Sequence, residues 1–139
     1  GYGLSYTRFT IGAPKLDTPV LQPGGRVTVS TTVTNSGDRA GDEVVQLYIH
    51  QQAGRASRPV RELKGFQRVT LKPGETRTVS FTLDESSVQY WNAAERGWVI
   101  DPGTFDIWVG SSSNAQNHGQ FSVGGAPRTG RGFLPNATR

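Results

Sequence analysis

Apolar and polar residues alternate one by one along four segments of the chain. Because successive side chains of a β-strand point to opposite faces, this period-two pattern predicts strands with one buried side and one exposed side. Such strands belong to antiparallel sheets covered on a single side, and two sheets of this kind facing each other make a β-sandwich. The predicted strands cover residues 26–34, 43–50, 76–83 and 104–110. Their predicted inward-facing residues are Val27, Val29, Val33, Val45, Leu47, Ile49, Val79, Phe81, Leu83, Phe105, Ile107 and Val109.

Turn signals separate these segments. Pro-Gly pairs at 23–24, 73–74 and 102–103 each precede a predicted strand. Proline suits the second position of a β-turn, and glycine accepts the positive φ of the third. Asp84 is a candidate N-cap for a one-turn helix start. Residues 88–92 and 97–100 predict an inserted hairpin, in which Trp91 and Trp98 are expected to close one end of the sandwich.

Composition agrees with a single all-β domain and changes the picture only at the C-terminus. The chain has 139 residues and no cysteine, which excludes disulfides and thiol chemistry. No signal peptide and no apolar stretch near the ~20 residues of a membrane span are visible. Three of the 15 basic residues and none of the 11 acidic residues lie in 124–139. That segment is therefore predicted to be a disordered basic tail, while the nearly neutral remainder argues against a nucleic-acid-binding surface.

Candidate catalytic groups are few. Hydrolysis catalysed by a pair of carboxyl groups needs the two groups about 5–10 Å apart. In the adjacent pair Asp42 and Glu43, strand alternation separates the two side chains, and the pair at 84–85 lies at a predicted helix start. The two histidines, His50 and His118, form no metal-binding pattern. The sequence therefore assigns no catalytic residue, no metal ligand and no cofactor.

Long ordered stretches at 1–9, 33–48, 58–66, 71–76 and 102–112 carry a family resemblance. They resemble the C-terminal fibronectin type III-like domain of family 3 glycoside hydrolases, which are β-glucosidase-type enzymes. The resemblance implies an immunoglobulin-like β-sandwich of about seven strands over residues 10–123. It also implies that residues 1–9, with Tyr2 and Tyr6, form a junction to a catalytic region outside this chain. The tail, 124–139, matches no part of the family pattern.

The resemblance implies a role without catalysis for this chain. In that family the nucleophile is an aspartate of an N-terminal barrel domain, and the acid/base comes from the following domain or a nearby loop. The implied role is an accessory or structural module of a β-glucosidase or β-xylosidase type enzyme, which packs on the catalytic domains and stabilises them. The implied location is secreted or periplasmic, and neither a nucleic acid nor a membrane is expected as a partner.

The outward-facing positions of two predicted strands form a candidate interaction surface. In a fibronectin-like order the 43–50 strand neighbours the 104–110 strand, so Tyr48 and Trp108 are expected side by side, together with His50 and Asp106. An exposed aromatic pair marks an interaction surface. Three readings stay open: docking of the catalytic domains or cover by the 88–100 hairpin, no special role, and binding of polysaccharide or lignin.

Overall fold

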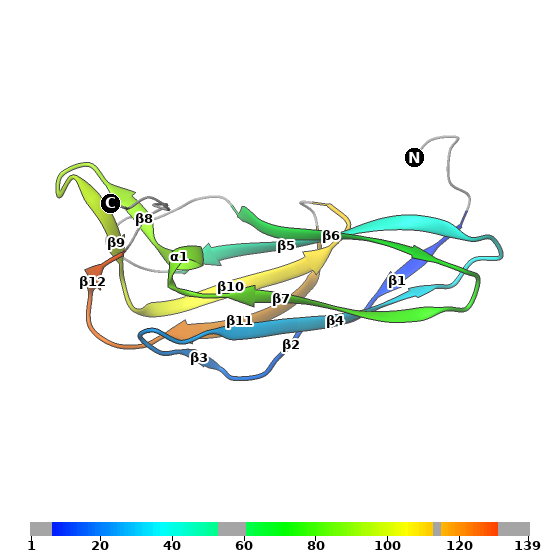
Figure 1. Ribbon diagram of the computed structural model, residues 1–139, viewed down its shortest axis with the longest axis horizontal. Coiled ribbons are helices and arrows are strands. Elements are labelled where there is room, and N and C mark those ends of the chain that lie inside the picture. The colour runs from blue at the N-terminus through cyan, green and yellow to red at the C-terminus, as the bar shows by residue number, and fades with distance from the viewer. Residues whose placement is uncertain (1–6, 53–60, 113–114, 131–139) are drawn as a thin grey trace.

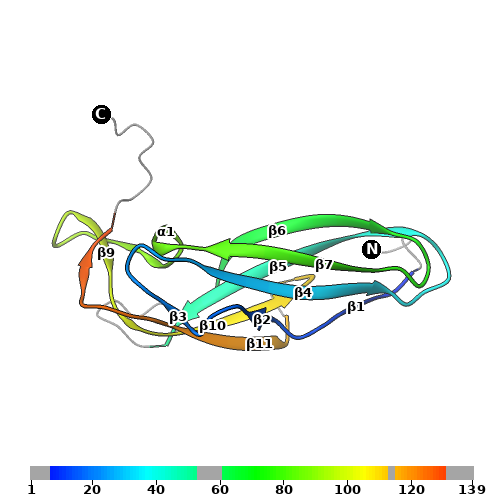
Figure 2. The same cartoon turned by 60° about the horizontal axis from the view of Figure 1, so that its bottom comes forward.

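Two β-sheets pack face to face in the computed structural model, which describes residues 7–52, 61–112 and 115–130 (Figure 1). The strands of both sheets run along the long axis of the molecule, and a hairpin lies at one end (Figures 1 and 2). No helix in the described part of the chain is long and apolar enough to cross a membrane. The elements are β1 (Phe9–Ile11), β2 (Lys15–Leu16), β3 (Val20–Leu21), β4 (Val27–Asn35), β5 (Gly41–Gln51), β6 (Glu62–Leu71), β7 (Thr76–Leu83), α1 (Glu85–Val88), β8 (Tyr90–Asn92), β9 (Gly97–Ile100), β10 (Gly103–Gly110), β11 (Asn117–Val123) and β12 (Arg128–Thr129).

Strand β4 is the centre of the first sheet. It pairs antiparallel with β7 along nearly its whole length, with Val29 opposite Phe81. On its other edge it pairs with β1 and β2. The β-branched residues that fill β4 suit a pleated ladder with one covered face. Its valines point inward and are buried, whereas most of its hydroxyl side chains point outward.

The second sheet has the order β3-β11-β10-β5-β6. The short β3–β11 pair is parallel, and the other pairs in this sheet are antiparallel. The N-terminal strand of the sandwich is split between the sheets: its segments β1 and β2 join the first sheet, and β3 joins the second. Six strands in the described residues have seven residues or more, and the split strand makes a seventh position. The prediction of an antiparallel, fibronectin-like sandwich of about seven strands is therefore confirmed.

The core lies between the two sheets. All twelve predicted inward-facing residues are buried. Phe105 and Phe121 stack on each other, with ring centroids 5.4 Å apart and an interplanar angle of 16°. Each large apolar side chain that leaves water in this way contributes about 1.5–3 kcal/mol. The alternation seen in the sequence is thus the alternation that builds the core.

Two of the three Pro-Gly pairs form the predicted turns. Gly24 has φ 76° and Gly74 has φ 80°, conformations that favour glycine. In the first turn Gly25 N donates to the carbonyl of Gln22 at 2.8 Å, and in the second Glu75 N donates to the carbonyl of Lys72 at 2.9 Å. Both are tight reversals that lead directly into the strands of the first sheet.

A three-stranded sheet, β12-β9-β8, closes one end of the molecule. Asp84 caps the preceding helix, as predicted, and accepts a hydrogen bond from Ser86 N at 2.9 Å. The hairpin at 88–100 is also present, but the prediction that Trp91 closes the sandwich is wrong. Trp91 is 54% exposed, and it packs edge-on against Trp98. Tyr90 takes the inward position instead, because neighbouring residues of a strand face opposite sides.

Residues 124–130 are the part of the predicted disordered tail, 124–139, that the structure describes. Over residues 124–130 the structure differs from the expected disorder, because β12 pairs with β9 and Gly130 N donates to the carbonyl of Trp98 at 2.9 Å. Arg128 Nε also donates to Glu85 Oε2 at 2.7 Å. These partners are distant in sequence, so local composition gave no sign of them. Residues 131–139 lie outside the described residues.

Candidate interaction surface

The four predicted surface residues lie on the outer side of the second sheet. In the register of β5 and β10, Trp108 is opposite Tyr48 and Asp106 is opposite His50. Their strand neighbours Leu47, Ile49 and Ile107 point into the core, which directs these four side chains outward. All four are half-buried rather than fully exposed.

Trp108 is held by neighbours on three strands or their ends. The Arg61 guanidinium carbon lies 3.9 Å from the centroid of the indole ring. Arg61 Nη1 also donates to the carbonyl of Ala115 at 2.8 Å, so the cation is anchored at a second point. The rings of His118 and His50 have centroids 5.4 Å and 6.5 Å from that of Trp108. A cation over an indole is worth about 0.5–2 kcal/mol, so this cover is a stable feature of the surface.

Asp106 is the centre of a hydrogen-bond network beside the tryptophan. Its Oδ1 accepts from Gln52 Nε2 at 3.0 Å and from Gln120 Nε2 at 3.1 Å, and lies 2.7 Å from His118 Nε2. Partial burial alone would raise the pKa of Asp106. The hydrogen bonds from His118, Gln120 and Gln52, together with the charge of His118, hold the pKa of Asp106 below its ordinary value. The carboxylate is thus kept ionised and fixed in place.

The aromatic row continues onto β6, where the sequence gave no site prediction. Leu63 lies opposite Tyr48, and Phe66 lies opposite Gln46 on the same outer side. Leu63 is 49% exposed and Phe66 is 66% exposed. We call the surface formed by Tyr48, Leu63, Phe66 and Trp108 the aromatic face.

A β-bulge explains why the sequence pattern did not predict Leu63 and Phe66 as surface residues. Between Leu47 and Tyr48 the register of β6 shifts, so Leu47 pairs with Gly65 while Tyr48 pairs with Leu63. Leu63 and Phe66 are three residues apart and still share a face, which breaks the period-two pattern. Their place within the family-like stretch 58–66 was the available sequence signal.

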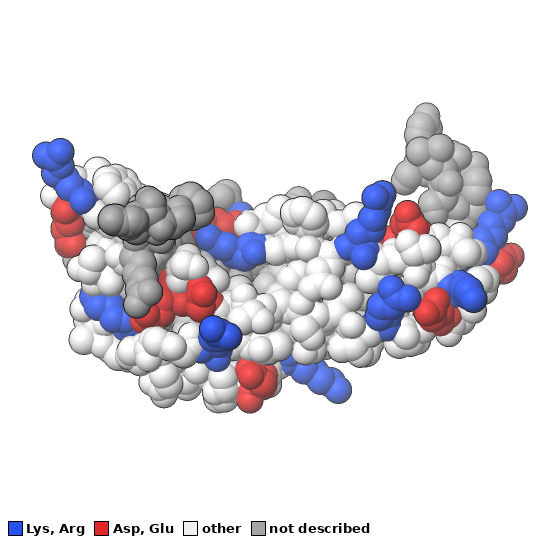
Figure 3. All heavy atoms as spheres, in the orientation of Figure 1, with Lys and Arg blue, Asp and Glu red and all other residues white. Residues whose placement is uncertain are grey.

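The outer side of the first sheet has a different chemistry. Eight hydroxyl side chains form four cross-strand pairs there: Thr28 with Thr82, Ser30 with Ser80, Thr32 with Thr78, and Thr34 with Thr76. In Figure 3, Lys and Arg side chains lie near Asp and Glu side chains toward both ends of the face shown, and uncharged atoms lie between them. We call these eight residues the hydroxyl face. It offers hydrogen-bonding groups but no large apolar side chain.

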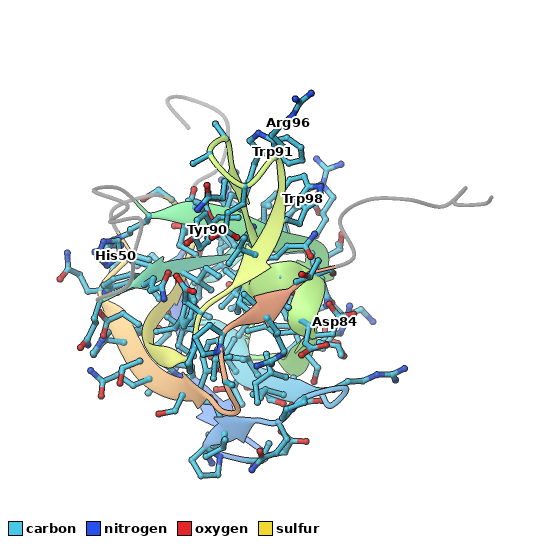
Figure 4. All side chains as sticks on the ribbon, turned by 90° about the vertical axis from the view of Figure 1, so that its left-hand side faces the viewer. His50, Asp84, Tyr90, Trp91, Arg96 and Trp98 are labelled. Carbon is cyan, nitrogen blue, oxygen red and sulfur yellow. The ribbon has the colours of Figure 1, made fainter. Side chains whose placement is uncertain are left out.

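The hairpin and His50 lie in different places at this end of the molecule. In the end-on view of Figure 4, Trp91, Trp98 and Arg96 lie on the hairpin at the top, whereas His50 lies to one side. The hairpin presents a separate surface, with Trp91 on its outer side.

The acidic pairs singled out in the sequence have structural partners. Asp42 accepts from Thr70 Oγ1 at 2.7 Å on the neighbouring strand, and Asp84 is the helix cap. Within residues 7–52, 61–112 and 115–130, no three His, Asp or Glu side chains group as a metal site would require. Tyr2 and Tyr6, the predicted junction residues, lie outside the described residues.

The two-sheet antiparallel sandwich places the chain in the class of fibronectin-like β-sandwich domains. Residues 43–113 match the family described as "Fibronectin type III-like domain". The match covers half of the chain, and the chain therefore belongs to the fibronectin type III-like domain family. This confirms the resemblance drawn from the sequence.

Curated relatives of the chain are glycosidases. It is 43% identical over 123 residues to the "Periplasmic beta-glucosidase" of Salmonella typhimurium, covering 88% of this chain and 16% of that protein. It is 49% identical over 117 residues to the "Beta-xylosidase" of Formosa agariphila, covering 84% of this chain and 16% of that protein. The chain thus spans about a sixth of the length of these relatives.

Solved structures give the same result. A β-glucosidase from Listeria innocua, in complex with gluconolactone, superposes with a TM-score of 0.81 at 36% identity, over 90% of this chain and 17% of that one. A β-glucosidase from Kluyveromyces marxianus, in complex with glucose, superposes with a TM-score of 0.82 at 35% identity, over 96% of this chain and 16% of that one. The similarity is confined to one domain of each larger enzyme.

Proposed function

We propose that this chain is a non-catalytic accessory module of a family 3 glycoside hydrolase of the β-glucosidase or β-xylosidase type, and that it packs on the catalytic domains and stabilises them. The observation that carries the proposal is the coverage: 88% of the chain aligns with 16% of a β-glucosidase at 43% identity. A segment of that size, matching a domain family of its own, is a module within a longer enzyme. We refer to that longer enzyme as the parent enzyme.

The relatives also support a location. One of them is named as a periplasmic β-glucosidase. We therefore extend the proposal to a parent enzyme that works in the periplasm or outside the cell. Fusion of the parent's own N-terminal region to alkaline phosphatase, which is active only after export, tests this part by itself.

Two measurements test the accessory role. The isolated chain, incubated with nitrophenyl β-glucoside and nitrophenyl β-xyloside, is expected to release no nitrophenol. The parent enzyme is expected to lose thermal stability when residues 10–139 are removed, because the catalytic domains would then expose the surface that the module covers. Turnover by the pure isolated chain, or an unchanged melting temperature of the truncated parent enzyme, would contradict the proposal.

Binding of polysaccharide or lignin by the aromatic face is the second candidate. One observation favours it, because Tyr48 and Trp108 lie side by side on an outer sheet face. Against it stands the guanidinium of Arg61, which already occupies one face of the Trp108 indole. A sugar ring needs such a face to stack on, so we expect no retention of the isolated chain on insoluble cellulose, xylan or lignin. Retention that Trp108→Ala abolishes would restore the binding function.

A further inference from the structure

We propose that the aromatic face, formed by Tyr48, Leu63, Phe66 and Trp108, is the surface through which this module packs on the remainder of the parent enzyme. The inference rests on the proposed accessory function and names the surface that performs it. Leu63 and Phe66 on β6 are the residues that the sequence did not single out for this role. The occupant is the rest of the same polypeptide, not a sugar and not a second copy of the module.

Exposure of apolar side chains is the first argument. Leu63 and Phe66 expose 49% and 66% of their surface on the outer side of the second sheet, where a polar residue would serve a solvated face. Leu63, Tyr48 and Trp108 form one cross-strand row over β6, β5 and β10, and Phe66 lies in the neighbouring row, opposite Gln46 on the same outer side. Single exposed apolar residues are ordinary, but a contiguous group of four on one sheet face marks an interface.

The residue types and their arrangement are the second argument. Interface centres are enriched in tryptophan, tyrosine, phenylalanine and arginine, and polar groups surround them. The aromatic face has these types at its centre, with Arg61 over Trp108. Its margin beside β11 is the Asp106 network with Gln52, Gln120 and His118.

The face is also ordered before any partner binds. Arg61 joins Trp108 to Ala115, and the Tyr48 hydroxyl donates to Gln46 Oε1. Side chains fixed in this way lose little further freedom on docking, so more of the contact energy remains available for association. An aromatic surface of no special role would not need such anchoring.

The remaining surfaces fit a domain interface less well. The hydroxyl face has no large apolar side chain to bury. The hairpin offers Trp91 at its own outer side, away from the sandwich faces. The relatives supply the occupant, because the chain covers only 16% of their length and the remaining five sixths of such a chain is tethered to the module. A tether keeps the partner at high effective concentration, which favours docking in cis over association of two copies.

The test compares charge insertions on the two sheet faces in the parent enzyme and in the isolated chain. Phe66→Asp places a charge in the aromatic face, and Thr78→Asp places one in the hydroxyl face, also at an exposed strand position. Phe66→Asp is expected to lower the melting temperature of the parent enzyme by about 3 °C or more, and Thr78→Asp by less than about 1 °C. In the isolated chain both variants are expected to shift the melting temperature by the same small amount, because both positions already face solvent.

Several results would overturn the inference. An equal or larger effect of Thr78→Asp in the parent enzyme would move the interface to the hydroxyl face. An equal loss of stability in the isolated chain with Phe66→Asp would make Phe66 a folding residue. A dimer of the isolated chain by light scattering that Phe66→Asp dissociates would identify a second copy as the occupant. If the parent enzyme with Phe66→Asp does not fold, the milder Leu63→Ser and Phe66→Ser replace it with the same expectations.

Failure of this inference differs from failure of the proposed function. If removal of residues 10–139 leaves the parent enzyme's melting temperature unchanged, the accessory function itself is wrong. If that removal lowers the melting temperature while Phe66→Asp does not, the function stands and the docking surface lies elsewhere.

Discussion

Gly37 lies where the entering chain passes against the turn between β4 and β5. A Cβ atom on Gly37 would stand 2.7 Å from the backbone nitrogen of Arg8 and closer still to Thr7 Oγ1. Thr7 cannot move away freely, because its hydroxyl donates to Asn35 Oδ1 at 2.6 Å. Overpacking of this kind costs about 1–3 kcal/mol, so Gly37→Ala is expected to lower the free energy of unfolding by that amount in urea titrations.

Gly97→Ala is the matched control for Gly37→Ala. At Gly97 the nearest heavy atom to a new Cβ is the Glu95 carbonyl oxygen at 3.8 Å, an ordinary van der Waals distance. This substitution is therefore expected to leave the urea midpoint unchanged or to raise it slightly. Equal effects of the two substitutions would show that the crowding at Thr7 and Arg8 has no energetic consequence.

Asp106 gives the protein a predictable response to acid. Its hydrogen bonds to His118, Gln120 and Gln52 make the pKa lower in the folded state than in the unfolded state, where it is about 4. A depressed pKa contributes stability above the unfolded value, and that stability is lost as the pH falls through the folded value. Asp106→Asn is therefore expected to reduce the free energy of unfolding by about 1 kcal/mol at pH 7 and by almost nothing near pH 2.5.

The measurement for Asp106 is a series of urea unfolding curves at pH 7, 4 and 2.5. Gln120→Ala removes one of the hydrogen bonds to the carboxylate and should move the acid dependence in the same direction by a smaller amount. A difference between wild type and Asp106→Asn that stays constant down to pH 2.5 would mean that the carboxylate charge is not the stabilising group.

At the scale of elements, one ion pair fastens the last described strand to the helix. Arg128 on β12 donates from Nε to Glu85 Oε2 at 2.7 Å and from Nη1 to the carbonyl of Gly124 at 2.9 Å. Both side chains of the pair are largely covered, with 21% and 29% of their surface exposed. A double-mutant cycle of Arg128→Ala and Glu85→Ala is therefore expected to give a coupling free energy of about 1 kcal/mol.

The carbonyl contacts of Arg128 provide the internal check of that cycle. They are lost in Arg128→Ala alone, so this variant should be less stable than Glu85→Ala. A coupling free energy near zero would mean that β12 is held by its backbone pairing with β9 and not by the ion pair.

The elements that could be predicted are those whose own residues carry the pattern. Strands β4, β5, β7 and β10 alternate strictly and bury every apolar residue of the pattern, so period two located them. Strand β11 is mostly polar, with Phe121 and Val123 as its buried apolar residues, and β6 is interrupted by the bulge near Leu63. Strand β12 depends on Glu85 and β9, which are distant in sequence, and no local signal encodes such a pairing.

The candidate surface also has a part that the sequence could predict and a part that it could not. The pairing of Tyr48 with Trp108 followed from alternation and the fibronectin-like strand order, and the structure has that register. The positions of three other residues depend on the bulge and on the return path of β6. These are Arg61 over the indole, Leu63 opposite Tyr48 and Phe66 opposite Gln46. A one-residue irregularity changes which side chains share a face, so sequence periodicity could not place these three.

At the scale of the whole molecule, the question is whether the three-stranded sheet at the end unfolds with the sandwich. Val88 and Ile100, at the two ends of the hairpin segment, belong to the same buried core cluster as both large sheets. The buried hydrogen bond from the Tyr90 hydroxyl to Asp101 Oδ2, at 2.8 Å, fixes β8 to the segment that links β9 to β10. A core shared in this way favours a single cooperative transition, as is usual for a domain of this size.

The three tryptophans allow that cooperativity to be measured, since Trp108 lies on the sandwich and the pair at 91 and 98 on the hairpin. A variant with Trp91→Phe and Trp98→Phe reports the sandwich by fluorescence, and Trp108→Phe reports the hairpin. In each variant the urea midpoint from fluorescence is expected to coincide with the midpoint from far-UV circular dichroism. If the hairpin signal changes at a lower urea concentration in Trp108→Phe, the end sheet is an independent unit, and the core contacts of Val88 and Ile100 are too weak to couple it to the sandwich.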